Sequence, residues 1–90
     1  MSVGTKPFSV ELITPERALP ALACTFAALP AWDGQVGFLA GRSPLVCKLG
    51  RGRLRLETER GWRNYRIEGG FAEMLDNRLT VLTDKAEEEG

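Results

Sequence analysis

Residues 53–67 read RLRLETERGWRNYRI and hold the most regular pattern in the chain. Two leucines alternate with charged side chains, and Tyr65 and Ile67 resume the alternation after a polar break. A period of two places successive side chains on opposite faces of a strand. Residues 58–61 supply turn chemistry between the two runs. The stretch therefore predicts a β-hairpin with one buried face and one solvated face.

Comparable runs lie on both sides of this hairpin. Residues 8–12 alternate, and residues 71–75 and 79–83 form two further apolar-rich runs that are separated by a polar turn. Shorter apolar runs occupy residues 24–29 and 45–49, with glycine or proline near their ends. Each of these five segments is expected to form a strand.

The fold class follows from what these runs share. No segment of helical length repeats with a period of 3.6 residues. We therefore expect an all-β fold, a small antiparallel, flattened β-sandwich or barrel of about eight to ten short strands. The side chains expected in its core are Val10, Leu12, Leu54, Leu56, Phe71 and Val81.

The length of 90 residues predicts one domain. Residues 1–7 are expected to form an N-terminal arm, residues 8–84 the sandwich, and residues 85–90 an acidic C-terminal tail that frays. The first residues lack the apolar centre of a signal peptide, and residues 27–32, the longest apolar run, are far too short to span a bilayer. The expected location is therefore inside the cell.

The composition argues against most catalytic sites. The chain has no histidine, which removes the commonest general base and metal ligand, and its two cysteines make neither a disulfide framework nor a zinc site. The carboxylates are scattered over different strands and turns without a spacing that pairs them. We expect no catalytic residue, no metal and no cofactor, so the sequence favours a binding or assembly module.

Basic residues gather in the hairpin. Residues 51–66 contain six arginines and two glutamates, a local net charge of +4, together with Trp62 and Tyr65. Arginines with interleaved aromatic side chains can bind single-stranded nucleic acid. The same arginines can instead form the solvated face of a half-buried hairpin, with neighbouring glutamates as cross-strand partners. Both interpretations stay open on composition alone.

Residues 34–45 read GQVGFLAGRSPL and combine three glycines with one proline. Glycine and proline are unfavourable inside strands, because glycine loses more backbone entropy and proline lacks a donor. This stretch is therefore expected to be an elaborate turn or a surface that another molecule recognises.

Four segments in order identify a family resemblance: residues 14–17 (TPER), 30–45 (PAWDGQVGFLAGRSPL), 69–73 (GGFAE) and 77–87 (NRLTVLTDKAE). Together they resemble the N-terminal β-sandwich domain of the epsilon subunit of F-type ATP synthase, which is called delta in mitochondria. The resemblance extends over nearly the whole chain, from about residue 8 to residue 87.

The resemblance implies a non-catalytic rotor subunit of the central stalk. Such a subunit joins the gamma subunit to the membrane c-ring and couples ion translocation to ATP synthesis. It would be a peripheral subunit at the cytoplasmic face of the inner or plasma membrane, with no nucleic-acid partner and no stable homo-oligomer. The alternative is a free β-barrel module that binds single-stranded nucleic acid through the Arg51–Arg66 hairpin.

The resemblance also implies two interfaces. Residues 34–45 would run from the turn that faces the c-ring to the surface that faces gamma. The expected c-ring contacts are Asp33, Gly34 and Gln35, and the expected gamma contacts are Thr14, Arg42 and Cys47.

The chain departs from the family pattern in four respects. An acidic residue is usual at Gln35, a histidine is frequent at Arg42, and a proline is common at Ala40. Family members also commonly continue into a helical hairpin, whereas this chain stops at Gly90. The braking of ATP hydrolysis and the binding of ATP that belong to that hairpin are therefore not expected here.

Overall fold

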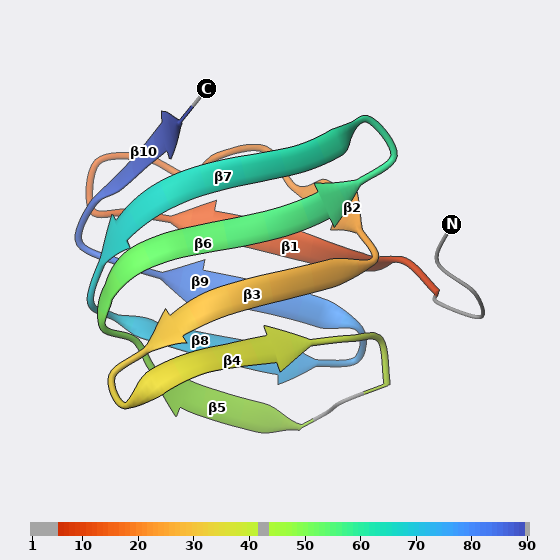
Figure 1. The fold of residues 1–90 in the computed structure, drawn as a ribbon, viewed down its shortest axis with the longest axis horizontal. Coiled ribbons are helices and arrows are strands. Elements are labelled where there is room, and N and C mark those ends of the chain that lie inside the picture. The colour runs from red at the N-terminus through yellow and green to blue at the C-terminus, as the bar shows by residue number, and fades with distance from the viewer. Residues whose placement is uncertain (1–5, 42–43, 90) are drawn as a thin grey trace.

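The computed structural model describes residues 6–41 and 44–89, and these residues form ten strands (Figure 1). Within this part of the chain no helix is long and apolar enough to cross a membrane. The strands are β1 (Phe8–Ile13), β2 (Leu22–Cys24), β3 (Phe26–Ala31), β4 (Gly34–Phe38), β5 (Leu45–Lys48), β6 (Arg51–Thr58), β7 (Gly61–Glu68), β8 (Phe71–Leu75), β9 (Arg78–Leu82) and β10 (Ala86–Glu89).

The strands pack as two five-stranded sheets, which confirms the predicted all-β sandwich. Sheet I has the order β2-β1-β9-β8-β5, and sheet II has the order β10-β7-β6-β3-β4. Figure 1 shows sheet II in front of sheet I. The largest fully buried side chains include Phe38, Leu29 and Leu54 of sheet II and Met74, Leu79 and Val81 of sheet I.

The hairpin predicted from residues 53–67 is confirmed as β6 and β7. The two strands pair from Arg51 opposite Glu68 to Thr58 opposite Gly61. Leu54 lies opposite Tyr65, and both side chains are buried. The regular alternation therefore places every second side chain in the core, as a period of two requires.

One strand pair differs from the expected antiparallel arrangement. β1 runs parallel to β9, with Ile13 opposite Leu82. In the tight turn between β8 and β9, Asp76 and Asn77 both adopt left-handed backbone conformations with φ of 51° and 57°. Such a turn reverses the chain at once, so β9 must run antiparallel to β8 and here lies along β1 in the same direction.

The apolar run at residues 24–29 forms parts of two strands instead of one. The chain bends at Thr25 and passes from β2 in sheet I to β3 in sheet II. The backbone N–H of Thr25 donates to the carbonyl oxygen of Glu57 at 2.9 Å, which ties the bend to β6. Hydrophobicity alone does not predict this change of sheet, because both strands supply apolar side chains to the same core.

Phe71 was predicted in the core, and this prediction is wrong. Its side chain is 54% exposed, whereas Ala72 and Met74 are fully buried. β8 therefore presents Phe71, Glu73 and Leu75 outward. Burying the other phase of this strand would have placed the Glu73 carboxylate in an apolar core, at a high desolvation cost.

The C-terminal residues do not fray as predicted. Ala86–Glu89 form β10, which pairs antiparallel with β7 at the edge of sheet II. Ala86 packs against the core, and the following glutamates form ion pairs with arginines of the hairpin. These contacts hold a segment whose one apolar side chain is that of Ala86. Of the expected N-terminal arm, residues 1–5 lie outside the described residues.

Candidate interface at one end and one face of the sandwich

The residues expected at the c-ring lie at the tip of the β3–β4 hairpin, with Asp33 in the turn and Gly34 and Gln35 at the start of β4. Asp33, Gly34 and Gln35 are all exposed, and Gly34 has a φ of 140°. Trp32, which precedes them, is 70% exposed, the largest value among the exposed hydrophobic side chains of the described residues. Its backbone N–H donates to the carbonyl oxygen of Lys48 at 3.1 Å. The turn is therefore fixed to β5 of the other sheet.

The glycine-rich stretch that follows is an edge strand, not only a turn. β4 pairs with β3 on one side, and Gly37 lies against the ring of Phe26. A Cβ on Gly37 would lie 3.0 Å from that ring, so the ring would have to shift by a few tenths of an ångström to make room for it. Glycine is tolerated because β4 lies at the edge of sheet II. Pro44 precedes β5 directly, as expected for a residue that fixes φ at the start of a strand.

Cys47, a predicted gamma contact, lies close enough to Asp33, a predicted c-ring contact, for their electrostatic interaction to matter. It lies on β5, and its side chain packs against the core while Val46 and Lys48 point outward. Burial raises the pKa of the Cys47 thiol, and the negative charge of Asp33 raises it further. This thiol therefore stays protonated at neutral pH and is a weak nucleophile.

Thr14 sits where the chain leaves β1 in a compact turn. Its hydroxyl donates to the carbonyl oxygen of Arg17 at 3.1 Å, and the backbone N–H of Arg17 donates to the Thr14 Oγ1 at 3.2 Å. A backbone hydrogen bond from Thr14 to Arg17 at 2.8 Å closes the same turn. Arg42, the remaining predicted gamma contact, lies outside the described residues.

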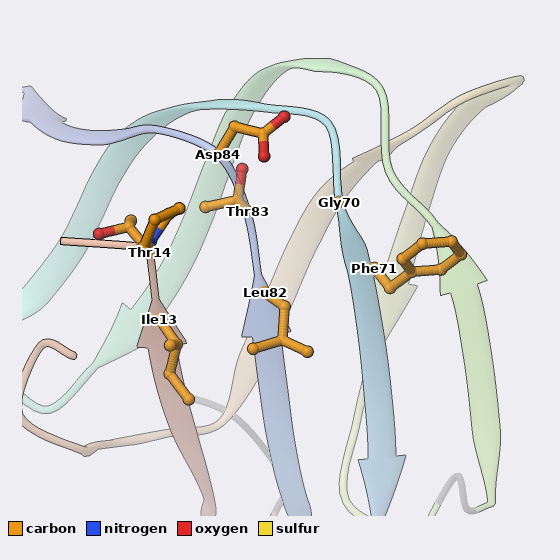
Figure 2. A pocket seen from close by; sticks show the side chains of 8 residues that line it. Ile13, Thr14, Gly70, Phe71, Leu82, Thr83 and Asp84 are labelled. Atoms are coloured by element: carbon orange, nitrogen blue, oxygen red, sulfur yellow. The ribbon is translucent and has the colours of Figure 1, made fainter. Parts of the chain in front are cut away.

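An open groove of about 540 Å³ borders Thr14 (Figure 2). Ile13, Leu82 and Phe71 lie in it side by side on β1, β9 and β8, because Leu82 is opposite Ile13 on one side and Phe71 on the other. Leu82 is 49% exposed and Phe71 54% exposed. The full lining is Ile13, Thr14, Pro15, Gly70, Phe71, Leu82, Thr83 and Asp84.

Gly70 makes this groove possible. It has a φ of 105°, and a Cβ at this position would overlap the carbonyl oxygen of Leu82. Only glycine allows β8 to start this close to β9 in that conformation. The Gly69-Gly70 pair of the sequence therefore fixes the shape of the groove wall.

The groove continues into the outer face of sheet I, whose side chains form three rows across the strands. The first row is Ile13, Leu82, Phe71 and Lys48. The second row is Glu11, Thr80, Glu73 and Val46, and the third is Ser9, Arg78 and Leu75. No ion pair involves Glu11 or Glu73 within residues 6–41 and 44–89.

The outer face of sheet II is organised differently. Glu89 accepts hydrogen bonds from Arg53 at 2.9 Å and from Arg66 at 3.3 Å, and Glu88 accepts one from Arg63 at 2.7 Å. The bond to Glu88 raises the pKa of Arg63. The hairpin arginines therefore find most of their partners on β10, a strand that the sequence interpretation treated as a frayed tail.

Aromatic contacts complete this face of sheet II. The guanidinium carbon of Arg55 lies 4.7 Å from the centroid of the Trp62 ring, and Phe26 meets the same ring edge-on at 6.2 Å. The described residues contain no cluster of three or more side chains that could hold a metal ion.

Sequence reasoning missed Phe71, Leu82 and Trp32 as surface residues. A signal was available for Phe71, because Glu73 shares its phase on β8 and a charged side chain marks the solvated face. No comparable signal existed for Trp32, whose exposure depends on how the turn is tied to β5.

Comparison with known proteins gives this surface its context. A family model described as "ATP synthase, Delta/Epsilon chain, beta-sandwich domain" matches residues 7–89. The ATP synthase epsilon chain of Rhodopirellula baltica is 43% identical over 75 residues, which cover 83% of this chain and 59% of that relative. The epsilon chain of Desulforudis audaxviator is 38% identical over 78 residues, covering 87% and 57% respectively. The chain thus spans less than two thirds of the length of these relatives.

Solved structures show the same fold. A chain in the mitochondrial ATP synthase structure of Euglena gracilis, which contains OSCP, F1 and the c-ring, matches with a TM-score of 0.82 at 27% identity. That match covers 98% of this chain and 58% of the other. A chain in the central stalk and c-ring structure of Tetrahymena thermophila matches with a TM-score of 0.73 at 14% identity, over 92% and 67%, and shows likeness of fold.

These matches confirm the resemblance inferred from the motifs, and epsilon chains are not the catalytic subunits of ATP synthase. The chain belongs to the delta/epsilon family of ATP synthase and contains its β-sandwich domain.

Proposed function

We propose that this chain is a structural, non-catalytic subunit of the rotor of an F-type ATP synthase, joining gamma to the c-ring. It binds gamma through the groove and the outer face of sheet I, with Thr14, Arg42 and Cys47 at the border of that contact. It meets the polar loops of the c-ring through Asp33, Gly34 and Gln35. In this position it transmits the torque of ion translocation toward ATP synthesis.

The observation that carries this proposal is the exposed apolar row next to Thr14. Phe71 and Leu82 keep about half of their surface in water in the isolated chain, and the groove beside them is open. Contiguous apolar surface of this kind marks contacts with other proteins. Trp32 adds a large exposed side chain to the turn assigned to the c-ring, and tryptophan is enriched among residues that dominate binding energy.

The two proposed contacts are mechanically connected. Trp32 bonds to the backbone of β5, and β5 pairs with β8 of the gamma-facing sheet. A force on the β3–β4 turn is therefore passed to the gamma-facing sheet through hydrogen bonds. Such a connection suits a part that rotates as one body with gamma and the ring. Association with the membrane is then peripheral, through the ring.

Recovery of the tagged chain from its native membranes tests the proposal. Identification of gamma, c-ring and catalytic-head subunits by mass spectrometry is the expected result. Recovery of the chain without any ATP synthase subunit would contradict it.

The nucleic-acid alternative has no observation in its favour. Of the hairpin arginines, Arg53, Arg63 and Arg66 are paired with β10, and Arg55 lies on Trp62. An affinity for oligonucleotides that falls steeply with salt would revive this alternative.

A further inference from the structure

The groove and the carboxylates beside it lie in consecutive rows of one face. From this arrangement we propose that the face recognises a gamma segment with two neighbouring features: a large apolar side chain that enters the groove, and a lysine or arginine that binds between Glu11 and Glu73. The inference rests on the proposed function, since it names the chemistry of the partner at the same surface.

The groove determines the first feature, the large apolar side chain of the partner. Three apolar side chains of three adjacent strands line its floor, and its volume of about 540 Å³ accommodates a leucine, methionine or aromatic side chain. Gly70 keeps the wall open, because any larger residue there would collide with β9. An apolar side chain that enters this groove removes both its own surface and that of Phe71 and Leu82 from water.

The second row determines the other feature. Glu11 and Glu73 occupy the two strands on either side of Thr80, so their backbones are about 10 Å apart at the usual strand spacing. Both side chains leave the same face, and one cationic group above the short Thr80 side chain can reach both carboxylates. Such charge-assisted hydrogen bonds are stronger than neutral ones.

Two basic residues lie in the rows next to these carboxylates, but neither forms an ion pair with them among the described residues. They are Lys48 in the first row and Arg78 in the third. On sheet II, by contrast, β10 supplies glutamates that reach three arginines. The two carboxylates beside the groove can therefore accept charge-assisted hydrogen bonds from a basic side chain of the partner.

The spacing of the rows shows that one segment can supply both groups. Consecutive rows are two residues apart along each strand, which corresponds to about 7 Å. Residues i and i+4 of a helix are about 6 Å apart along its axis. A gamma helix lying along β9 can therefore place an apolar side chain in the groove and a basic side chain over Thr80.

Binding to the purified gamma subunit of the same source tests the inference. The dissociation constant of the full chain is measured by calorimetry at 50 and 300 mM NaCl. Glu11→Gln together with Glu73→Gln removes the two charges without changing shape. It is expected to weaken binding about tenfold at low salt and to flatten the salt dependence, because charge-assisted contacts are lost. Phe71→Ser is expected to weaken binding about tenfold or more at both salt concentrations.

The matched control is Glu59→Gln together with Glu87→Gln, which makes the same change of charge at exposed positions in the β6–β7 turn and on β10. It is expected to leave binding unchanged. Thermal unfolding of each variant shows that it is folded, and Leu82→Ser replaces Phe71→Ser if the latter is not. An unchanged dissociation constant for the charge variant or for the groove variant overturns the inference, while gamma binding by the unmodified chain still supports the proposed function. Failure of the unmodified chain to bind gamma overturns the proposed function itself.

Discussion

Sheet I and sheet II share one core but treat their outer faces in opposite ways. On sheet II, arginines of β6 and β7 are bonded to glutamates of β10, and Arg55 covers Trp62. On sheet I, Phe71 and Leu82 are about half exposed, and Glu11 and Glu73 have no ion pair among the described residues. The two sheets have equal strand number, but sheet II pairs three of its arginines internally, whereas in our proposal sheet I offers its outer side chains to a partner.

The largest effect is expected at Gly70, on the wall of the groove. Gly70→Ala places a Cβ against the carbonyl oxygen of Leu82 at a φ of 105°, and should lower the free energy of unfolding by more than about 3 kcal/mol. The control is Gly61→Ala in the turn of sheet II, where φ is 102° but nothing lies within 4 Å. This variant should cost only about 1 kcal/mol of backbone strain. Urea titration measures both, and equal losses would remove the special role of Gly70.

Each of the two edge strands of sheet I contains a cysteine. The pH dependence of stability tests how strongly burial affects the thiol of Cys24. Burial raises the pKa of Cys24 from 9.0 to about 12, and the hydrogen bond from the Phe26 backbone opposes this only in part. Between these values the unfolded thiol loses its proton and the native thiol keeps it. Stability should therefore fall as pH rises above about 9, by up to about 1.4 kcal/mol per pH unit.

Chemical denaturation at pH 8 and pH 10.5 measures this loss. Burial also raises the pKa of Cys47 and of Tyr65, and since both remain in the variant, Cys24→Ala isolates the share of Cys24. The variant should lose less stability on alkalisation than the unmodified chain. If both lose the same amount, the Cys24 thiol does not resist ionisation in the native state.

Replacing one aromatic side chain on each face tests whether the two faces differ in their contribution to stability. Trp62→Ala removes contacts to Arg55 and Phe26 and should lower the free energy of unfolding by about 1–2 kcal/mol. Phe71→Ala removes a side chain that is 54% exposed and should change it by less than about 1 kcal/mol. Thermal unfolding distinguishes the two, and a larger loss for Phe71 would place that side chain in the core after all.

A small, salt-dependent effect is expected at β10. Glu88→Gln with Glu89→Gln removes three surface ion pairs, and should lower the free energy of unfolding by about 1 kcal/mol at low salt, because exposed pairs contribute little each. The difference from the unmodified chain should shrink at 0.5 M NaCl. A difference that does not depend on salt would mean that backbone pairing with β7, not charge, holds this strand.

The sequence predicts the sandwich well, because alternation at residues 8–12 and 53–67 determines which side chains are buried. It fails at Phe71, where β8 has apolar residues on both faces and only Glu73 marks the outer one. It also fails at β10, because strand pairing between residues distant in the chain is not visible in a polar tail. The local sequence pattern determines which side chains of a strand are buried, while the pairing of strands depends on the assembled fold.

The interface was less predictable than the fold. The motifs locate Thr14 and the turn at residues 33–35, and the structure brings this turn next to Cys47. The groove that Thr14 borders depends on the register of β1, β9 and β8. This register cannot be read from any one segment of the sequence. The rows of the outer face exist only after these three strands are paired.

Hydroxyl-radical footprinting of the chain alone, with gamma, and with gamma and c-ring together tests the central claim most directly. Free in solution, Phe71, Leu82, Trp32 and Trp62 should all be oxidised, since their exposed fractions are 54%, 49%, 70% and 45%. We predict that gamma protects Phe71 and Leu82, that Trp32 becomes protected only when the c-ring is added, and that Trp62 reacts equally in all three. Protection of Trp62 by gamma, with Phe71 and Leu82 still oxidised, would contradict the assignment of the two faces.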